Sequence, residues 1–186
     1  MTMKLTINFL KAYVKSMRLY YAFVTGISGW LGIAYYQYIA DENYFNPQSG
    51  FIQTLQEPTP LSKKIVIIVI LFLAWGVNQI INDYLGLKED RVNAPDRPMV
   101  TGELKPRSAI TFSIILLTAN LFITWFYLEP IAVVPLIVGI GLNVLYEEAK
   151  GYGIWGNIVF GVMIAMCGLF GCWAAGPTDT YFTRST

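Results

Sequence analysis

The 186-residue chain contains no histidine. This absence excludes zinc sites with histidine ligands, Ser-His-Asp triads and haem held by an axial histidine. The two cysteines, Cys167 and Cys172, lie in an apolar run, where a thiol usually behaves as a small buried hydrophobic side chain. The sequence has no other cysteine that could complete a metal site. Any catalysis therefore has to use carboxylates, lysine, arginine, tyrosine or a bound metal.

Charge is also scarce. Charged residues make up 13% of the chain and hydrophobic residues 55%, whereas about 25% of the residues in a typical soluble domain are charged. The formal net charge is +1, so bulk electrostatics does not attract the chain to nucleic acid. This composition argues against a soluble fold.

Long hydrophobic segments dominate the sequence instead. A helix crosses the hydrocarbon core of a bilayer with roughly 17 to 25 residues. Five segments of that length contain no charged side chain: residues 19–40, 65–82, 108–128, 130–146 and 154–175. They predict an all-α protein, a polytopic membrane bundle with about five transmembrane helices, in a single domain over residues 1–186.

Basic residues set the expected orientation in the membrane. The segment 1–18 carries Lys4, Lys11, Lys15 and Arg18 without an acid, which indicates an interfacial helix on the cytoplasmic side. With five crossings, ten Lys and Arg residues lie on the side of the amino terminus and three on the other side. Because basic residues are enriched on the cytoplasmic side, we expect a cytoplasmic amino terminus and an external carboxyl terminus.

Polar residues gather where the second apolar segment ends. Amides and carboxylates at a membrane boundary are costly unless they face a polar cavity or a bound ion. On a straight helix, Asp83 and Asp90 would point in directions only about 20° apart and would be separated by about 10 Å. Such spacing suits Mg²⁺ ions on either side of an extended anion, and we infer a diphosphate. The alternative is that Asp83, Glu89 and Asp90 form a solvated helix end.

A second polar group follows the fourth apolar segment. Tyr146 and Lys150 are spaced i, i+4, so one helix face could offer a hydroxyl and an ammonium group to the same anion. The alternative for Tyr146 alone is an interfacial anchor, which is a common role of tyrosine at a membrane boundary.

The sequence that begins at Asn82 resembles the UbiA superfamily of intramembrane prenyltransferases. The first acidic motif of that family is written Asn-Asp-x-x-Asp-x-x-x-Asp, and an Arg-Pro pair and a Gly follow it. The matching residues in this chain are Asn82, Asp83, Asp90, Arg97, Pro98 and Gly102. Gly86 stands in place of the middle Asp, which removes one expected metal ligand, and Glu89 could substitute for it.

The resemblance also covers the loop after the fourth segment. The family carries a Tyr and a Lys there, followed by Gly-Asn, and this chain has Tyr146, Lys150 and then Gly156 and Asn157. The reaction implied by the resemblance is transfer of an isoprenyl group from a Mg²⁺-bound prenyl diphosphate to an acceptor, commonly an aromatic ring. It implies catalytic roles for Asp83 and Asp90. The metal would be held by Asn82, Asp83 and Asp90, and the diphosphate by Tyr146, Lys150, Arg97 and Arg18.

Only part of the family's fold is matched. Family members typically have nine helices and a second Asp-rich motif after the sixth, and that motif is absent here. The resemblance therefore implies the amino-terminal part of such an enzyme, whether truncated, split or degenerate. Its expected partners are an isoprenyl diphosphate, an aromatic or lipid acceptor, membrane lipid and a missing carboxyl-terminal half or second subunit, without nucleic acid.

A non-catalytic membrane protein is the alternative function, either a degenerate remnant or a partner subunit of such an enzyme. Gly86 and the missing second motif favour this alternative, whereas the Asn-Asp, Arg-Pro and Tyr-x-x-x-Lys patterns favour descent from an enzyme. Another metal-using membrane class, the CDP-alcohol phosphotransferases, is disfavoured because its Asp-Gly-x-x-Ala-Arg start is missing.

Overall fold

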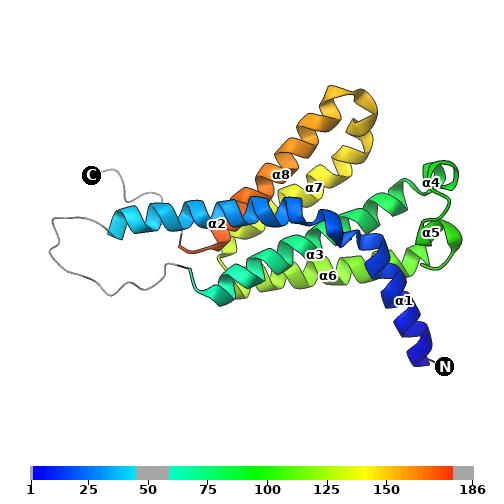
Figure 1. The fold of residues 1–186 in the computed structure, drawn as a ribbon, viewed down its shortest axis with the longest axis horizontal. Helices are drawn as coiled ribbons and strands as arrows, with labels where there is room; N and C mark the ends of the chain where they lie inside the picture. Colours follow the sequence, from blue (N-terminus) through cyan, green and yellow to red (C-terminus); the bar gives the residue numbers. More distant parts are fainter. Residues whose placement is uncertain (1, 45–58, 178–186) are drawn as a thin grey trace.

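The computed structural model describes residues 2–44 and 59–177, and this part of the chain is helical without strands (Figure 1). The helices are α1 (Thr2–Met17), α2 (Phe23–Tyr44), α3 (Leu61–Leu85), α4 (Leu87–Asn93), α5 (Pro98–Thr101), α6 (Pro106–Tyr127), α7 (Val133–Ala149) and α8 (Ile154–Ala174). Three short 3₁₀ turns connect them: η1 (Leu19–Tyr21), η2 (Pro130–Ala132) and η3 (Lys150–Tyr152). The all-α prediction is confirmed.

The long helices α2, α3, α6, α7 and α8 run back and forth between the two ends of the molecule (Figure 1). Helices α1, α4 and α5 and the turn between α7 and α8 lie toward one end, which we call the polar end. The turn between α6 and α7 lies toward the opposite end, where Lys63 Nζ forms an ion pair with Glu129 Oε1 at 3.0 Å. This alternation is the arrangement that the five apolar segments predict.

Four of the described helical segments are long and apolar enough to cross a membrane: Leu61–Leu85, Pro106–Tyr127, Pro130–Tyr152 and Ile154–Ala174. The expected number was about five, and the segment that does not qualify is the first, residues 19–40. It begins in η1 and continues as α2. Four tyrosines, a glutamine and two acids lie in the second half of α2 and make it less apolar than the other long helices. Even so, α2 lies beside α8 in the bundle (Figure 1).

Glycines allow α2 and α8 to approach closely. A Cβ atom at Gly32 would lie 2.0 Å from the carbonyl oxygen of Gly168, and one at Gly171 would lie 2.1 Å from the carbonyl oxygen of Gly29. Backbone therefore packs on backbone, as in many contacts between membrane helices. Beside these glycines, Ile33 and Phe170 belong to the larger of two hydrophobic clusters.

The second hydrophobic cluster fixes α1 to the polar end. Ala12, Tyr13 and Met17 are buried there with residues of α3, α5 and α6. The Tyr13 hydroxyl and Ser113 Oγ of α6 are hydrogen-bonded at 2.7 Å. The opposite face of α1 exposes Ile7, Leu10 and Val14. The predicted helix over residues 1–18 is thus confirmed as a helix, and its interfacial position in the membrane stays a prediction that this exposed apolar stripe supports.

Candidate functional site

Gly86 separates α3 from α4. The expectation of one straight helix through Asp83 and Asp90 is wrong, because α3 ends at Leu85 and α4 begins at Leu87. The Gly86 N–H closes α3 by donating to the carbonyl oxygen of Asn82 at 2.9 Å, and the Gly86 carbonyl oxygen accepts from the Asp90 N–H at 2.9 Å. One residue therefore ends one helix and begins the next.

The two acidic side chains on either side of Gly86 contact one cation. Arg97 Nη1 lies 3.2 Å from Asp83 Oδ1, and the same nitrogen donates a hydrogen bond to Asp90 Oδ2. The predicted separation of about 10 Å along a straight helix does not hold, since both carboxylates contact a single guanidinium nitrogen. Arg97 precedes α5, whose first residue is Pro98.

A second arginine reaches Asp83 from the end of α1. Arg18 Nη2 donates to Asp83 Oδ1 at 2.5 Å, and Arg18 Nη1 donates to Gln79 Oε1 at 3.0 Å. The side chain of Asp83 is only 1% exposed. Within the described residues, its other oxygen, Oδ2, has no hydrogen-bond partner. We refer to Arg18, Gln79, Asp83, Asp90 and Arg97 as the acid–arginine cluster.

The carboxyl-terminal end of α7 lies against this cluster. Asn143 Nδ2 donates to Asn82 Oδ1 at 3.0 Å. Lys150 Nζ contacts Glu147 Oε2 at 2.6 Å and Glu89 Oε2 at 3.9 Å. The two polar segments that the sequence singled out, near residues 83 and 150, are therefore neighbours in space.

Tyr146 and Lys150 make different contacts despite their helical spacing. The Tyr146 ring is partly buried, with its centroid 5.8 Å from that of Phe160 on α8. Lys150 lies one turn further on, at the start of η3, where Glu147 contacts its ammonium group. Of the residues singled out from the sequence, Arg18, Asp83, Asp90 and Arg97 form one connected group. Asn82 and Lys150 lie at its border, and Tyr146 lies further toward α8.

Sequence reasoning missed three residues of this site, namely Gln79, Asn143 and Glu147. Gln79 precedes Asp83 by one helical turn, so the two side chains share a face of α3. Asn143 is a polar residue inside an apolar segment, which is costly in a membrane and is a useful sign of function. Glu147 carries no comparable signal, because acids at helix ends are common.

The donor set at the cluster fits Mg²⁺. Mg²⁺ is usually bound by one or two carboxylates together with waters and substrate phosphates. Asp83 and Asp90 supply two carboxylates, Asn82 adds an amide oxygen, and the buried Asp83 Oδ2 is a ready acceptor. In the part of the chain that the structure describes, no three Asp, Glu or Cys side chains come together as a metal-binding group. These residues suit a cation that also binds a phosphate ligand.

We expect the Gly86→Asp variant to bind Mg²⁺ more tightly in the presence of inorganic diphosphate, by about tenfold, because the charge of the ligands sets the affinity of hard cations. The backbone permits the change, since φ of Gly86 is −84°. A Cβ atom there would lie 3.8 Å from Glu147 Oε2 and 3.2 Å from the Asn82 carbonyl oxygen, a tight contact that needs a shift of a few tenths of an ångström. Calorimetric titration of Mg²⁺ gives the affinity. Gly86→Asn adds the same bulk without charge, and equal affinities of the two variants would contradict the expectation.

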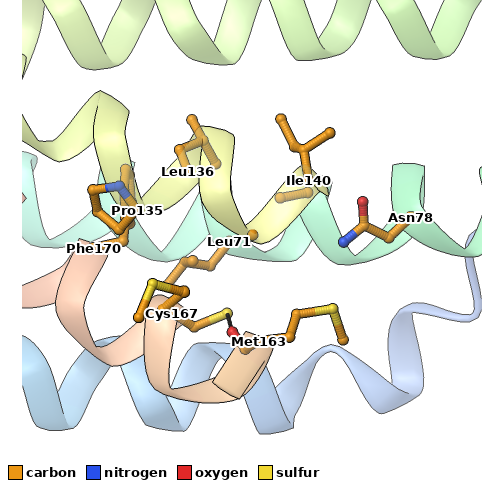
Figure 2. A pocket seen from close by; sticks show the side chains of 11 residues that line it. Leu71, Asn78, Pro135, Leu136, Ile140, Met163, Cys167 and Phe170 are labelled. Atoms are coloured by element: carbon orange, nitrogen blue, oxygen red, sulfur yellow. Dashed lines mark hydrogen bonds between the residues drawn. The ribbon is translucent and has the colours of Figure 1, made fainter. Parts of the chain in front are cut away.

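A small cavity lies deeper in the bundle, between α3, α7 and α8. Its volume is about 30 Å³, and its lining is mostly apolar. Figure 2 shows Asn78 at one end of the cavity, Pro135 and Phe170 at the other, and the sulfur atoms of Met163 and Cys167 along one side. Asn78 Oδ1 is buried and has no hydrogen-bond partner within the described residues. Because Asn78 precedes Asn82 by one turn of α3, it places a polar group at the end of the cavity that is nearer to the polar site.

The fold and the site define an integral membrane protein whose acid–arginine cluster lies at one end of a helical bundle. The chain belongs to the UbiA prenyltransferase family, which matches residues 49–183. The family resemblance drawn from the motif at Asn82 is thereby confirmed, and with it a relationship to transferases that act in membranes.

Individual relatives agree with this assignment. Digeranylgeranylglyceryl phosphate synthase from Methanothrix thermoacetophila is 31% identical over 130 residues, which cover 70% of this chain and 46% of the relative. The enzyme of the same name from Sulfolobus acidocaldarius is 28% identical over 170 residues, which cover 89% of this chain and 54% of the relative. The chain thus spans about half the length of the curated relatives that it matches.

A solved structure has the same fold. It is described as "Structural and mechanistic insights into the biosynthesis of Digeranylgeranylglyceryl phosphate synthase in membranes". It superimposes with a TM-score of 0.71 at 25% sequence identity, over 90% of this chain and 53% of that chain. The helical bundle described above is therefore the arrangement of a membrane prenyltransferase over about half of its length.

Proposed function

We propose that this chain provides the diphosphate-binding part of an intramembrane prenyltransferase, which transfers an isoprenyl group from a Mg²⁺-bound isoprenyl diphosphate. The observation that carries the proposal is Asp83, a buried carboxylate at the polar end with two arginines on one oxygen and, among the described residues, no partner on the other. Family membership supports it.

The charges of the site suit this ligand. Four acids, Asp83, Asp90, Glu89 and Glu147, form ion pairs with three bases, Arg18, Arg97 and Lys150. The one excess negative charge suits a diphosphate that arrives together with a divalent cation. An arriving diphosphate could accept hydrogen bonds from Arg97 and Lys150, whose side chains are 32% and 39% exposed, and Asp83 and Asp90 would hold the accompanying cation. Hydrogen bonds between charged groups of this kind are among the stronger ones in proteins.

The proposed roles are assigned residue by residue. Asn82, Asp83 and Asp90 would hold Mg²⁺, which when bound would stabilise the negative charge that develops on the departing diphosphate. Arg97, Lys150 and Tyr146 bind phosphate oxygens, and Arg18 supports the same region. Asp83 and Asp90 are catalytic in the sense that they keep the leaving group in place through its cation.

The isoprenyl tail enters the apolar interior beyond Asn78, along α3, α7 and α8. The cavity there measures about 30 Å³, whereas sites for small molecules usually measure about 300 to 1,000 Å³. We therefore propose that further helices, which relatives of about twice the length have room for, enclose the tail. They would exclude water, which would otherwise quench the allylic cation.

The acceptor is proposed to be a glycerophosphate lipid. An aromatic acceptor was expected from the family resemblance, but the relatives do not support it, because their name denotes a glyceryl phosphate product. We further propose that residues 1–186 form a single domain and that the polar end faces the cytoplasm, on the grounds of the basic residues described above.

The direct test of this function is binding of an isoprenyl diphosphate by the chain in lipid nanodiscs, compared with the isoprenyl alcohol of the same tail. We expect the diphosphate to bind at least about tenfold more tightly than the alcohol in Mg²⁺, because of its charge, and to lose this advantage in EDTA. The chain alone is expected to release no prenylated product from a glycerophosphate lipid. Equal affinity for diphosphate and alcohol would contradict the proposal and would favour the non-catalytic alternative.

A further inference from the structure

The backbone at Arg18 is unusual. With φ 47° and ψ 48°, Arg18 is the one residue other than glycine with a positive φ in the described part of the chain. It lies directly after the end of α1 at Met17 and before η1. Glycine adopts this left-handed conformation without a penalty, whereas other residues do not. An arginine in this conformation indicates that the contacts of its side chain outweigh the strain of its backbone.

The Arg18 side chain spans two residues on one face of α3. Its two terminal nitrogens donate to Gln79 Oε1 at 3.0 Å and to Asp83 Oδ1 at 2.5 Å. The planar guanidinium group holds both acceptors in a fixed geometry, which the single ammonium group of a lysine cannot reproduce. Arg18 therefore restricts the rotation of the Asp83 carboxylate.

The two arginines contact the same carboxylate oxygen. Arg18 Nη2 and Arg97 Nη1 both approach Asp83 Oδ1, whereas Asp83 Oδ2 has no partner within the described residues. An acidic oxygen without a partner is costly when it is buried. The two arginines thus hold Asp83 Oδ1, and Asp83 Oδ2 remains available to a ligand.

We infer that Arg18 is a positioning residue: together with Gln79 it fixes Asp83 so that Oδ2 serves as the cation ligand, and it does not itself bind the diphosphate. This inference rests on the proposed function and corrects the role that the family resemblance implies for Arg18. It also makes α1 a support of the site, because α1 is fixed to α6 by the Tyr13–Ser113 hydrogen bond just before Arg18.

The test measures cation and anion affinity separately for the 186-residue chain in nanodiscs. The affinity for Mn²⁺ in the presence of inorganic diphosphate is measured by electron paramagnetic resonance, and the affinity for diphosphate without metal by calorimetry. Arg18→Lys keeps the charge but loses the pair of terminal nitrogens that donate to Gln79 and Asp83. We expect it to weaken Mn²⁺ binding by about tenfold, as is usual for residues that orient metal ligands. Diphosphate affinity without metal should stay unchanged.

Two further variants complete the test. Gln79→Leu removes the amide oxygen that accepts from Arg18 Nη1 without changing the charge. It should also weaken Mn²⁺ binding. Lys15→Gln is the matched control, because Lys15 lies on α1 but pairs with the exposed Glu103 at 3.4 Å, and it should leave Mn²⁺ affinity unchanged. If Arg18→Lys fails to fold, as judged by circular dichroism, Gln79→Leu decides the question.

The outcomes separate this inference from the proposed function. Unchanged Mn²⁺ affinity in a folded Arg18→Lys variant, or in Gln79→Leu when Arg18→Lys does not fold, overturns the positioning role and leaves the proposed function standing. A loss of metal-free diphosphate affinity in Arg18→Lys also overturns it, because Arg18 would then bind the anion itself. If the unsubstituted chain binds neither Mn²⁺ nor diphosphate, both the proposed function and this inference are wrong.

Discussion

Asp83→Asn is expected to weaken Mg²⁺-dependent binding of isoprenyl diphosphate on the order of 100-fold, which corresponds to about 2.7 kcal/mol. The substitution keeps the size of the side chain and removes its charge. Asp83 is 1% exposed and contacts both Arg18 and Arg97, so neither water nor a neighbouring acid can readily replace it. The affinity is measured on the chain in nanodiscs with and without Mg²⁺.

Asp96→Asn is the control for this variant. Asp96 lies in the same polar stretch, next to Arg97, but its side chain is exposed, so the same loss of charge should leave the affinity unchanged. Helicity and melting temperature must be compared as well, because the Asn side chain leaves two arginines without their carboxylate. If folded Asp83→Asn protein binds the diphosphate as the unsubstituted chain does, the metal-binding role of Asp83 is wrong.

Gly171→Ala is expected to lower the stability of the bundle by about 3 kcal/mol, the upper part of the range for overpacked sites. A Cβ atom at Gly171 would lie 2.1 Å from the Gly29 carbonyl oxygen and 2.8 Å from the Gly29 Cα. These are backbone atoms, so no side-chain rotation relieves the clash, and α2 and α8 must move apart. Thermal unfolding in detergent measures the effect.

The matched control lies on the same helix. Gly161→Ala makes the same change in α8, but no described residue outside the adjoining backbone of α8 lies within 4 Å of the new Cβ position, and the added methyl group favours a helix. Cys172 provides a second measurement, because it is buried and its backbone nitrogen lies 2.7 Å from a Cβ atom built at Gly32. Maleimide labelling of Cys172 should be faster in Gly171→Ala than in Gly161→Ala. Equal melting temperatures and labelling rates would contradict the close contact.

The sequence was sufficient to predict the class of fold, because the absence of charge over whole segments has few explanations outside a membrane. It was less informative about α2. Its tyrosines, glutamine and acids reduce its apolar character, and its place in the bundle depends on glycines that allow it to approach α8. Such contacts depend on how two helices that are distant in the sequence pack together, and the hydrophobic pattern of one segment does not predict this packing.

The residues of the site were also partly predictable. Asp83, Asp90 and Arg97 were recognised through their motif, but their geometry depends on Gly86, where a helical pattern was read as continuous although the helix ends. A glycine inside a helical pattern can be tolerated within the helix or can mark its end, and the neighbouring residues decide which of the two occurs. Gln79 was overlooked because an amide one turn before an acid indicates a site only when another group contacts both side chains, and here that group is Arg18, which follows the end of α1.

The central claim is that Asp83 and Asp90 hold the cation of a bound diphosphate at the polar end of the bundle. An experimental structure of the protein with Mg²⁺ and an isoprenyl thiodiphosphate, which resists cleavage, tests this claim most directly. We predict a Mg²⁺ ion at about 2.1 Å from Asp83 Oδ2, with the diphosphate between this ion and the side chains of Arg97 and Lys150. A diphosphate bound away from Asp83, with Arg97 still bridging Asp83 and Asp90, would contradict the account.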